Sequence, residues 1–451
     1  MVSALMEYIP DTIANMMAGH ASPSHSTQVL AAFSLAGLVR LLLVMGLING
    51  VSAALDTLCS QAFGAMRFAM MWMFCQAGLL LYGMALPALC LVLWTSGAGL
   101  ELLGQNADIA RTAGHVLAIT TVALPFAIIY TVMKSGLQAQ NIALPFVLCD
   151  LASFVVSTSA AYVLAFKFGL GYMGVALAAP TSWLVKSLVL VPFLLRNSAF
   201  CQAWPGWQLR EALVLVPKIW KLGASGVLMV TFQTLGFAIL TFMAGLLPSA
   251  STAISACGIF SALVVILSMP LLGFCVAGAV RIGNALGAGD ARRAATIARI
   301  VLTATTIVSA IDAVLLATVS GTFARSYTSN TATIAMVSRL GQNLVPLMPL
   351  ISFTFGLQAV LRGCGKQFLC AQLNFVCLFV LGAPVGALFA LHQQLGLLGL
   401  WYGNLVGLTV FLIIGLAWFH RLSWDDMAQL AQRNAHLRSP AVAEDMPSDA
   451  C

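Results

Sequence analysis

Long apolar runs separated by short polar joints dominate the chain. A helix needs roughly 20 apolar residues to cross a bilayer core about 30 Å thick. Runs near that length cover residues 2–18, 30–53, 69–94, 113–132, 146–166, 172–195, 223–247, 253–279, 297–319, 344–361, 373–391 and 397–419. The pattern predicts an all-α polytopic membrane protein with about twelve transmembrane helices. The first run is short, which leaves open a truncated helix one.

Composition supports a membrane protein and excludes several other classes. Hydrophobic residues make up 61% of the 451 positions and charged residues 8%, whereas soluble domains carry about 25% charged residues. The cysteines lie mostly inside the apolar runs without CxxC spacing, so we expect small hydrophobes and no metal site or other cofactor. The net charge of +7 is spread over separate joints, so we expect the lipid bilayer as the main partner and no nucleic acid.

The distribution of Lys and Arg predicts the orientation. The joints after even-numbered runs hold most of these residues, whereas the opposite joints hold Arg111, Lys167, Arg325 and Arg339. Because positive joints stay in the cytoplasm, both termini are predicted to be cytoplasmic. The polar composition after Trp424 predicts a disordered tail.

Three short patterns recur in order along the chain. Residues 60–65 (SQAFGA) match 283–288 (GNALGA) at an offset of 223, and 170–174 (LGYMG) match 395–399 (LGLLG) at 225. Lys134-Ser-Gly is matched to Arg362-Gly-Cys at an offset of 228. An offset of six helices returns the chain to the same side, so the halves are predicted to be parallel repeats around a central cleft.

The repeat divides the chain into four predicted regions. They are an N-lobe with helices 1–6 (1–196), a cytoplasmic connector (197–221), a C-lobe with helices 7–12 (222–420) and a cytoplasmic polar tail (421–451). The connector sequence WPGWQLREAL predicts a short helix at the membrane surface.

Two motifs resemble those of a known family. Residues 54–65 (ALDTLCSQAFGA) and 280–290 (VRIGNALGAGD) resemble the helix-two and helix-eight signatures of multidrug and toxic compound extrusion (MATE) transporters of the eukaryotic type. Supporting matches are 17–20 (MAGH), 137–141 (LQAQN) and 361–365 (LRGCG). The signature residues are Asp56, Gln61, Gly64, Arg281, Asn284, Gly287 and Arg362.

The resemblance implies a secondary antiporter that exports organic, mostly cationic or amphipathic compounds in exchange for H⁺ or Na⁺. We expect no enzymatic activity, because the sequence offers no His-box, metal-ligand cluster or nucleophile–base pairing. We also expect a monomer, in the plasma membrane or a vacuolar or other internal membrane. The chain departs from the family where helices seven and ten usually carry carboxylates, because Gln233, Ala238 and Ile351 stand there.

Ionisable residues inside the apolar runs are the ion-coupling candidates, because a charge at a helix centre costs about 2.5–3.5 kcal/mol. Asp11 follows Pro10, whose kink frees a backbone carbonyl, and an ion-binding role competes with an ion pair to Arg40. We expect Asp11→Asn to abolish pH-driven transport without affecting folding.

Asp56 and Asp150 are the other coupling candidates. Asp56 is read either as a gate or as a helix-end residue that binds backbone amides or Arg67. Asp150 is expected to form a loose structural pair with Lys186. Asp312 is expected to be solvated or paired with Arg339 near the outer end of its helix.

Polar residues define candidates for the substrate cleft, namely Gln61, Gln233, Gln358 and Arg40. A glutamine inside a helix serves equally well as a hydrogen-bonding group between helices. Two other functions stay open, a lipid-linked oligosaccharide flippase and a non-transporting homologue with an interaction or sensing role. The first requires a strongly cationic cleft, for which the runs supply Arg40 and Lys186.

Overall fold

The computed structural model describes residues 13, 14, 17, 18, 21, 26–196, 204–248, 250–328 and 330–435. Ten of its helices are long and apolar enough to cross a membrane, or eleven when the pair Thr331–Asn343 and Leu347–Gly363, bent by 64°, is one span. The all-α polytopic fold predicted from the apolar runs is therefore confirmed. Helix one, predicted at 2–18, lies largely outside the described residues.

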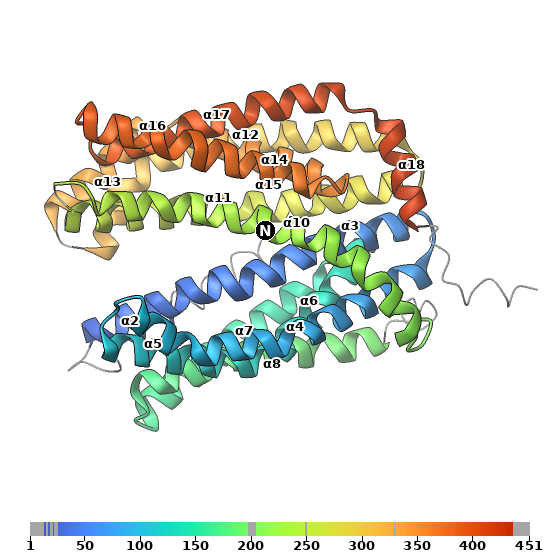
Figure 1. Ribbon diagram of the computed structural model, residues 1–451, viewed down its shortest axis with the longest axis horizontal. Helices are drawn as coiled ribbons and strands as arrows, with labels where there is room; N and C mark the ends of the chain where they lie inside the picture. Colours follow the sequence, from blue (N-terminus) through green and yellow to red (C-terminus); the bar gives the residue numbers. More distant parts are fainter. Residues whose placement is uncertain are drawn as a thin grey trace, which may run out of the picture. The chain divides into compact units, whose positions relative to one another are not determined.

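The chain forms two compact units. The N-terminal unit holds the chain up to Ala224 together with the segment from Gln432, and the C-terminal unit holds Ser225–Ala431. The N-terminal unit contains α2 (Ser26–Val39), the π-helix η2 (Arg40–Met45), α3 (Gly46–Gly64), α4 (Phe68–Leu102), α5 (Ala107–Thr120), the 3₁₀ turn η3 (Thr121–Ala123), α6 (Leu124–Ala139), α7 (Leu144–Tyr162), the π-helix η4 (Val163–Lys167) and α8 (Gly171–Arg196) (Figure 1).

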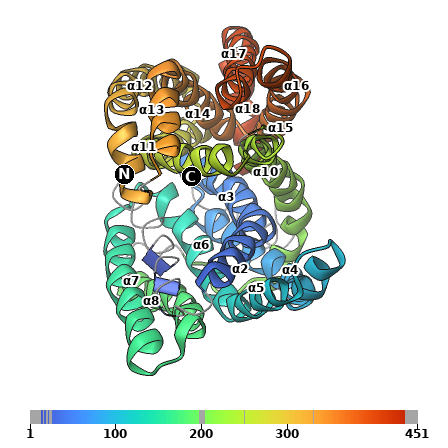
Figure 2. The same ribbon diagram turned by 90° about the vertical axis from the view of Figure 1, so that its left-hand side faces the viewer.

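The C-terminal unit continues the order of elements. It contains α11 (Ala250–Gly287), α12 (Ala291–Tyr327), α13 (Thr331–Asn343), α14 (Leu347–Gly363), α15 (Gln367–Asn374), η5 (Phe375–Gly382), α16 (Ala383–Ala387), η6 (Leu388–His392) and α17 (Leu397–Arg421) (Figure 2). The helix α10 (Leu209–Ala244) crosses the unit boundary, and so does α18 (Trp424–Ala435).

Two predictions about the connecting segments need correction. The sequence from Leu209 forms the first part of α10, which runs unbroken past residue 221, and no separate surface helix stands there. Residues 424–435 form α18 instead of a disordered tail, and Ala428 and Ala431 pack with Ile282 and Leu286. The two alanines lie on one apolar face of the helix, which packs against α11. The overall polar composition of the segment does not reveal such a face.

The two units repeat the same backbone geometry at their first joint. The amides of Ala65, Met66 and Arg67 donate to the carbonyls of Gln61, Phe63 and Ala62. At 223 positions further on, the amides of Ala288, Gly289 and Asp290 donate to the carbonyls of Asn284, Leu286 and Ala285. Met66 and Gly289 both have a positive φ, of 60° and 76°. The C-terminal ends of both motifs thus form one type of helix-to-helix turn.

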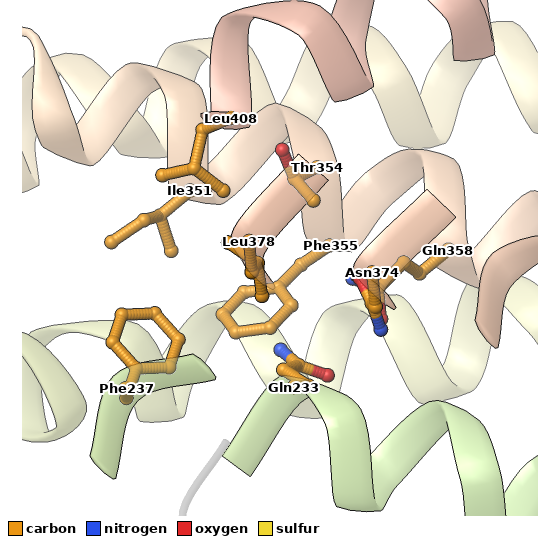
Figure 3. Close-up of a pocket in the computed structure, with 9 residues that line it drawn as sticks. All are labelled: Gln233, Phe237, Ile351, Thr354, Phe355, Gln358, Asn374, Leu378 and Leu408. Carbon is orange, nitrogen blue, oxygen red and sulfur yellow. The ribbon is translucent and has the colours of Figure 1, made fainter. Parts of the chain in front are cut away.

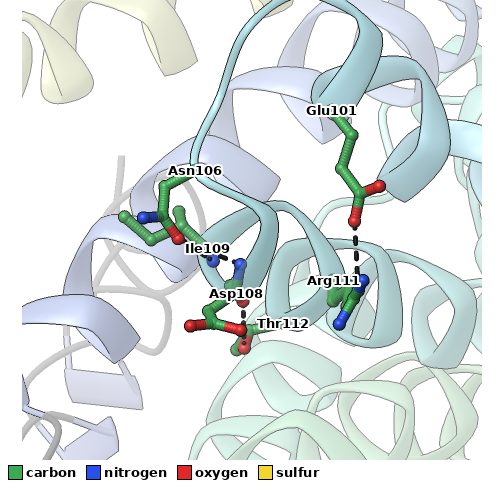
Figure 4. A network of polar contacts seen from close by, with 6 residues as sticks. All are labelled: Glu101, Asn106, Asp108, Ile109, Arg111 and Thr112. Atoms are coloured by element: carbon green, nitrogen blue, oxygen red, sulfur yellow. Dashed lines mark hydrogen bonds and ion pairs between the residues drawn. The ribbon is translucent and has the colours of Figure 1, made fainter.

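A second repeated joint separates α4 from α5. The Oδ1 atom of Asn106 accepts the amides of Asp108 at 3.0 Å and Ile109 at 3.4 Å, while Arg111 Nε donates to Glu101 Oε1 at 3.2 Å (Figure 4). Asn330, 224 positions later, caps α13 in the same way through the amides of Ala332 and Thr333. Both asparagines satisfy amides that a helix leaves unpaired at its N-terminus.

The remaining joints fix the register of the repeat. The π-helices η4 and η6 lie 225 positions apart, each followed by a glycine with positive φ, Gly171 at 56° and Gly396 at 58°. After α6 and α14, Ile142 N donates to Leu137 O and Lys366 N donates to Leu361 O, which gives an offset of 224. The offset of 228 predicted for Lys134 and Arg362 is therefore wrong, because backbone hydrogen bonds align Arg362 with Gln138.

The connector is held against the N-terminal unit by one glutamine. Gln76 Nε2 donates to Gly206 O at 2.6 Å, and the amide of Gln208 donates to Gln76 Oε1 at 2.8 Å. The ring of Trp204 lies 5.9 Å from that of Trp72 and 5.3 Å from that of Trp207, both in edge-to-face geometry. The fully buried Gln76 thereby satisfies two backbone groups of a non-helical segment.

Candidate functional site

A buried ion pair is the central feature of the N-terminal unit. Lys186 Nζ on α8 lies 3.0 Å from Asp150 Oδ1 on α7, with 5% of the lysine side chain and none of the aspartate side chain exposed. Helices α7 and α8 form an extensive packing interface, and Ser153 and Ser182 join them by a hydrogen bond of 2.7 Å. The loose pairing expected from the sequence is in fact a close contact.

Two aromatic rings complete the surroundings of the Lys186 ammonium. Its nitrogen lies 4.9 Å from the ring centroid of Trp183 and 5.6 Å from that of Tyr130. The two rings are in edge-to-face contact at 6.0 Å, and Tyr130 Oη donates to Asp150 Oδ1 at 3.5 Å. The ammonium therefore has a carboxylate and two aromatic faces around it. We call Asp150, Tyr130, Trp183 and Lys186 the ammonium cluster.

The C-terminal unit contains a small cavity of about 10 Å³, close to the volume that one water molecule requires. It is lined by Gln233 and Phe237 of α10, by residues of α14 and by residues from α15 to α17, as Figure 3 shows. Asn374 Nδ2 donates to Met229 O at 3.0 Å, and Gln358 Nε2 donates to Asn374 Oδ1 at 3.5 Å. We call this space the amide cavity.

The structure brings Gln233, Ile351 and Gln358 together at the amide cavity. The resemblance places carboxylates of the family at the positions of Gln233 and Ile351, yet the cavity is lined by amides, one hydroxyl and apolar groups. The hydroxyl of Thr354 has no hydrogen-bond partner among the described residues. The arrangement suits a neutral polar group such as water, because it supplies no negative charge to a cation.

The register of the repeat shows that the ammonium cluster and the amide cavity occupy equivalent places. Tyr130 and Asp150 correspond to Thr354 and Asn374 at an offset of 224. Trp183 and Lys186 correspond to Leu408 and Phe411 at an offset of 225. Three of these four C-terminal residues line the amide cavity. An offset of 224 pairs Asp150 with Asn374 and Tyr130 with Thr354 in the sequence alone. The predicted offset of 228 did not reveal these two pairs.

The other described candidate residues of the N-terminal unit, Arg40, Asp56 and Gln61, are on η2 and α3, whereas the ammonium cluster is on α6, α7 and α8. Asp56 is buried in α3, and Gln61 in the same helix accepts a hydrogen bond of 3.1 Å from Asn434 Nδ2 of α18. Arg40 is half-buried at the start of η2. Asp11 lies outside the described residues. The part of the chain that the structure describes contains no cluster of His, Cys, Asp or Glu suited to a metal ion.

Asp312 differs from its prediction. The sequence predicts a solvated residue or a pair with Arg339, but Asp312 is 5% exposed and its Oδ2 has no hydrogen-bond partner among the described residues. It lies on the face of α12 that also buries Ser309 and Ala313. The helix α12 extends to Tyr327, which leaves Asp312 about four turns from its end.

The fold and the repeated sites define a polytopic membrane transporter built from two related halves. The sequence matches the MatE family model over residues 1–163 and 227–388, so the chain belongs to this family of multidrug and toxin extrusion transporters. The resemblance seen in the signature motifs is thereby confirmed.

Individual relatives support this assignment. Multidrug and toxin extrusion protein 2 of Mus musculus is 30% identical over 99% of this chain and 77% of its own length. Protein DETOXIFICATION 16 of Arabidopsis thaliana is 28% identical over 95% of this chain and 87% of its own length. The crystal structure of the eukaryotic MATE transporter AtDTX14 superposes with a TM-score of 0.88 at 23% identity, covering 96% of each chain.

Proposed function

We propose that this protein is a secondary active antiporter that exports organic cationic or amphipathic compounds in exchange for H⁺ or Na⁺, by alternating access of its two lobes. The ion pair of Asp150 and Lys186 is the observation that carries the proposal. Burying two charges in a lobe is expensive even when they are paired, and ionisable groups inside membrane spans mark ion and substrate pathways. Membership of the family supports the same assignment.

The coupling follows from competition at Asp150. A proton or Na⁺ that neutralises the carboxylate removes its attraction for an ammonium group, because one carboxylate charge cannot balance two cations. Binding of the coupling ion and binding of a cationic compound then exclude each other. The gradient of the ion thereby drives the compound in the opposite direction. In this scheme the protein acts as a monomer without a further cofactor, in the plasma membrane or an internal membrane, with both termini cytoplasmic.

Exchange in proteoliposomes tests this function. Vesicles containing purified protein are loaded with labelled tetraethylammonium, and efflux is measured after imposing a pH gradient or, separately, a Na⁺ gradient. We expect one gradient to drive efflux at least several-fold above protein-free vesicles, and Asp150→Asn to remove that stimulation. Efflux that ignores both gradients would contradict ion coupling.

A flippase and a non-transporting homologue would each give a different result in the same vesicles. A flippase for lipid-linked oligosaccharides needs cations that hold a pyrophosphate, but the buried cation Lys186 is already matched by the charge of Asp150. A non-transporting homologue would show no exchange of any labelled solute. Movement of a fluorescent lipid-linked pyrophosphate without movement of tetraethylammonium would replace the antiporter proposal with the flippase.

A further inference from the structure

The ammonium cluster has the chemistry of a receptor for an organic cation. The Lys186 nitrogen is placed 3.0 Å from a carboxylate oxygen and within 6 Å of the centroids of two aromatic rings. Aromatic faces attract cations through the ring quadrupole, and aromatic cages are a general means of recognising substituted ammonium groups. In this structure the cation in the site is the Lys186 ammonium group.

The fold does not require these charges. At the equivalent place in the C-terminal unit, Asn374 replaces Asp150, Leu408 replaces Trp183 and Phe411 replaces Lys186. The helices there pack with a neutral hydrogen bond between Gln358 and Asn374, and Phe411 is buried in an apolar cluster. One half of the protein thus serves as an internal reference in which the same helices assemble without a charged pair or an aromatic cage.

The helices around the cluster are held independently of Lys186. Ser187 Oγ donates to Phe126 O at 2.8 Å and joins α8 to α6, while Ser153 and Ser182 join α7 to α8. Gly174 approaches the backbone of Leu164 and Ala165 so closely that a Cβ atom there would lie 2.5 Å from Leu164 C. Lys186 is a long, flexible side chain whose ammonium leaves a site by bond rotation. These contacts between the helices do not involve Lys186.

We propose that Asp150, Tyr130 and Trp183 form the binding site for the cationic group of an organic ammonium compound, and that Lys186 occupies this site as a tethered surrogate which the compound displaces. This inference rests on the proposed export function and names the class of compound and the residues that receive its charge. When the compound leaves, Lys186 returns and pairs with Asp150, until the coupling ion neutralises the carboxylate and releases the lysine again.

A tethered competitor lowers the apparent affinity for the compound. Only the fraction of molecules in which Lys186 has left the site can bind, and the observed dissociation constant rises accordingly. Removing the competitor is therefore expected to tighten binding, which is the opposite of the usual result of deleting a residue that contacts substrate. This sign distinguishes a surrogate from a lysine with a purely structural role.

Binding of tetraethylammonium to purified protein in detergent tests the proposal without any ion gradient. We expect Lys186→Ala to bind it on the order of tenfold more tightly than the unchanged protein in calorimetric titration. Trp183→Leu, which introduces the residue of the other half, is expected to weaken binding on the order of tenfold while keeping the elution profile. The matched control is Lys218→Ala, since Lys218 is half-buried and lies 6.0 Å from the single ring of Phe74; its binding should be unchanged.

Each outcome decides the proposal. Lys186→Ala that binds no more tightly than the unchanged protein overturns it. If that variant does not fold, Trp183→Leu in the otherwise unchanged chain decides, and unaltered affinity there overturns the proposal equally. Binding with the expected pattern but no exchange in vesicles refutes the antiporter and leaves the binding site intact. Ion-driven exchange with binding insensitive to Lys186 and Trp183 refutes the site and leaves the antiporter intact.

Discussion

Asp150 and Asn374 hold equivalent places in the two halves, yet the first is paired with the ammonium of Lys186 and the second accepts a hydrogen bond from the amide of Gln358. The backbone joints fix this equivalence. The same arrangement of helices therefore holds a charged pair in one unit and a neutral pair in the other. At this pair of equivalent places, the charged pair is therefore in the N-terminal unit.

The buried pair should behave as a unit in stability measurements. Lys186→Met leaves the Asp150 carboxylate buried without its partner, and we expect a loss of about 3–5 kcal/mol. The double variant Asp150→Asn with Lys186→Met should recover most of that loss, as the neutral pair in the other half indicates. Thermal unfolding in detergent, followed by tryptophan fluorescence, measures both.

The exposed pair of Arg111 and Glu101 supplies the control. It has a similar distance of 3.2 Å, but 68% of the arginine side chain is exposed. Because water and salt screen such a pair, Arg111→Met should change stability by less than about 1 kcal/mol. Equal losses at the two pairs would mean that burial does not determine the effect.

Transport measurements compare two of the three carboxylates predicted as coupling candidates. We expect both Asp11→Asn and Asp150→Asn to lose efflux stimulated by the ion gradient while keeping the folded elution profile. Each substitution removes a group that binds a proton or a cation and keeps nearly the same volume. Unchanged gradient-driven efflux in proteoliposomes would remove the corresponding residue from the mechanism.

Labelling of introduced cysteines tests the parallel repeat and its orientation. Met66, which is 71% exposed, and Ala288 stand in equivalent joints, so Met66→Cys and Ala288→Cys should react with a membrane-impermeant thiol reagent from the same, cytoplasmic side. Gln105→Cys should react from the other side. The native cysteines in the described residues are buried or half-buried, so the unchanged protein serves as the background. Reaction of Met66→Cys and Ala288→Cys from opposite sides would refute the parallel repeat.

Equivalent glycines should be equally intolerant of a side chain. A Cβ atom at Gly399 would lie 2.6 Å from Ala390 N, and one at Gly174 would lie 2.5 Å from Leu164 C. Because backbone atoms cannot move aside cheaply, we expect Gly399→Ala and Gly174→Ala each to destabilise the protein by about 1–3 kcal/mol or more. Gly83→Ala is the matched control, since nothing lies within 4 Å of its added atom, and its melting temperature should not fall.

The connector should depend on Gln76. Gln76→Leu keeps an apolar contact but removes the acceptor for the Gln208 amide and the donor to Gly206 O. We expect faster hydrogen exchange at the Gln208 amide by at least tenfold, together with a loss of about 1–3 kcal/mol from the unsatisfied backbone groups. Exchange at Gln208 as slow as in the unchanged protein would show that the tryptophan contacts alone hold the segment.

Much of this protein follows from its sequence for a simple physical reason. Lipid forces each crossing segment to be a helix of limited length, so apolar runs predict spans without knowledge of packing. Short joints such as 60–65 and 283–288 repeat because their backbone hydrogen bonds are local. The sequence therefore determined the class of fold, the family and the order of the repeat.

The tertiary structure decided what local patterns do not encode. Which side chains meet across α6, α7 and α8 depends on the rotation and depth of each helix, so the contact of Asp150 with Lys186 and the place of Tyr130 and Trp183 required the packed helices. The burial of Asp312 and the amphipathic packing of α18 likewise depend on neighbours distant in the chain. The periodicity of apolar residues along the chain predicts where a helix forms. The free energy of burying a charged side chain depends on the groups that tertiary packing places around it.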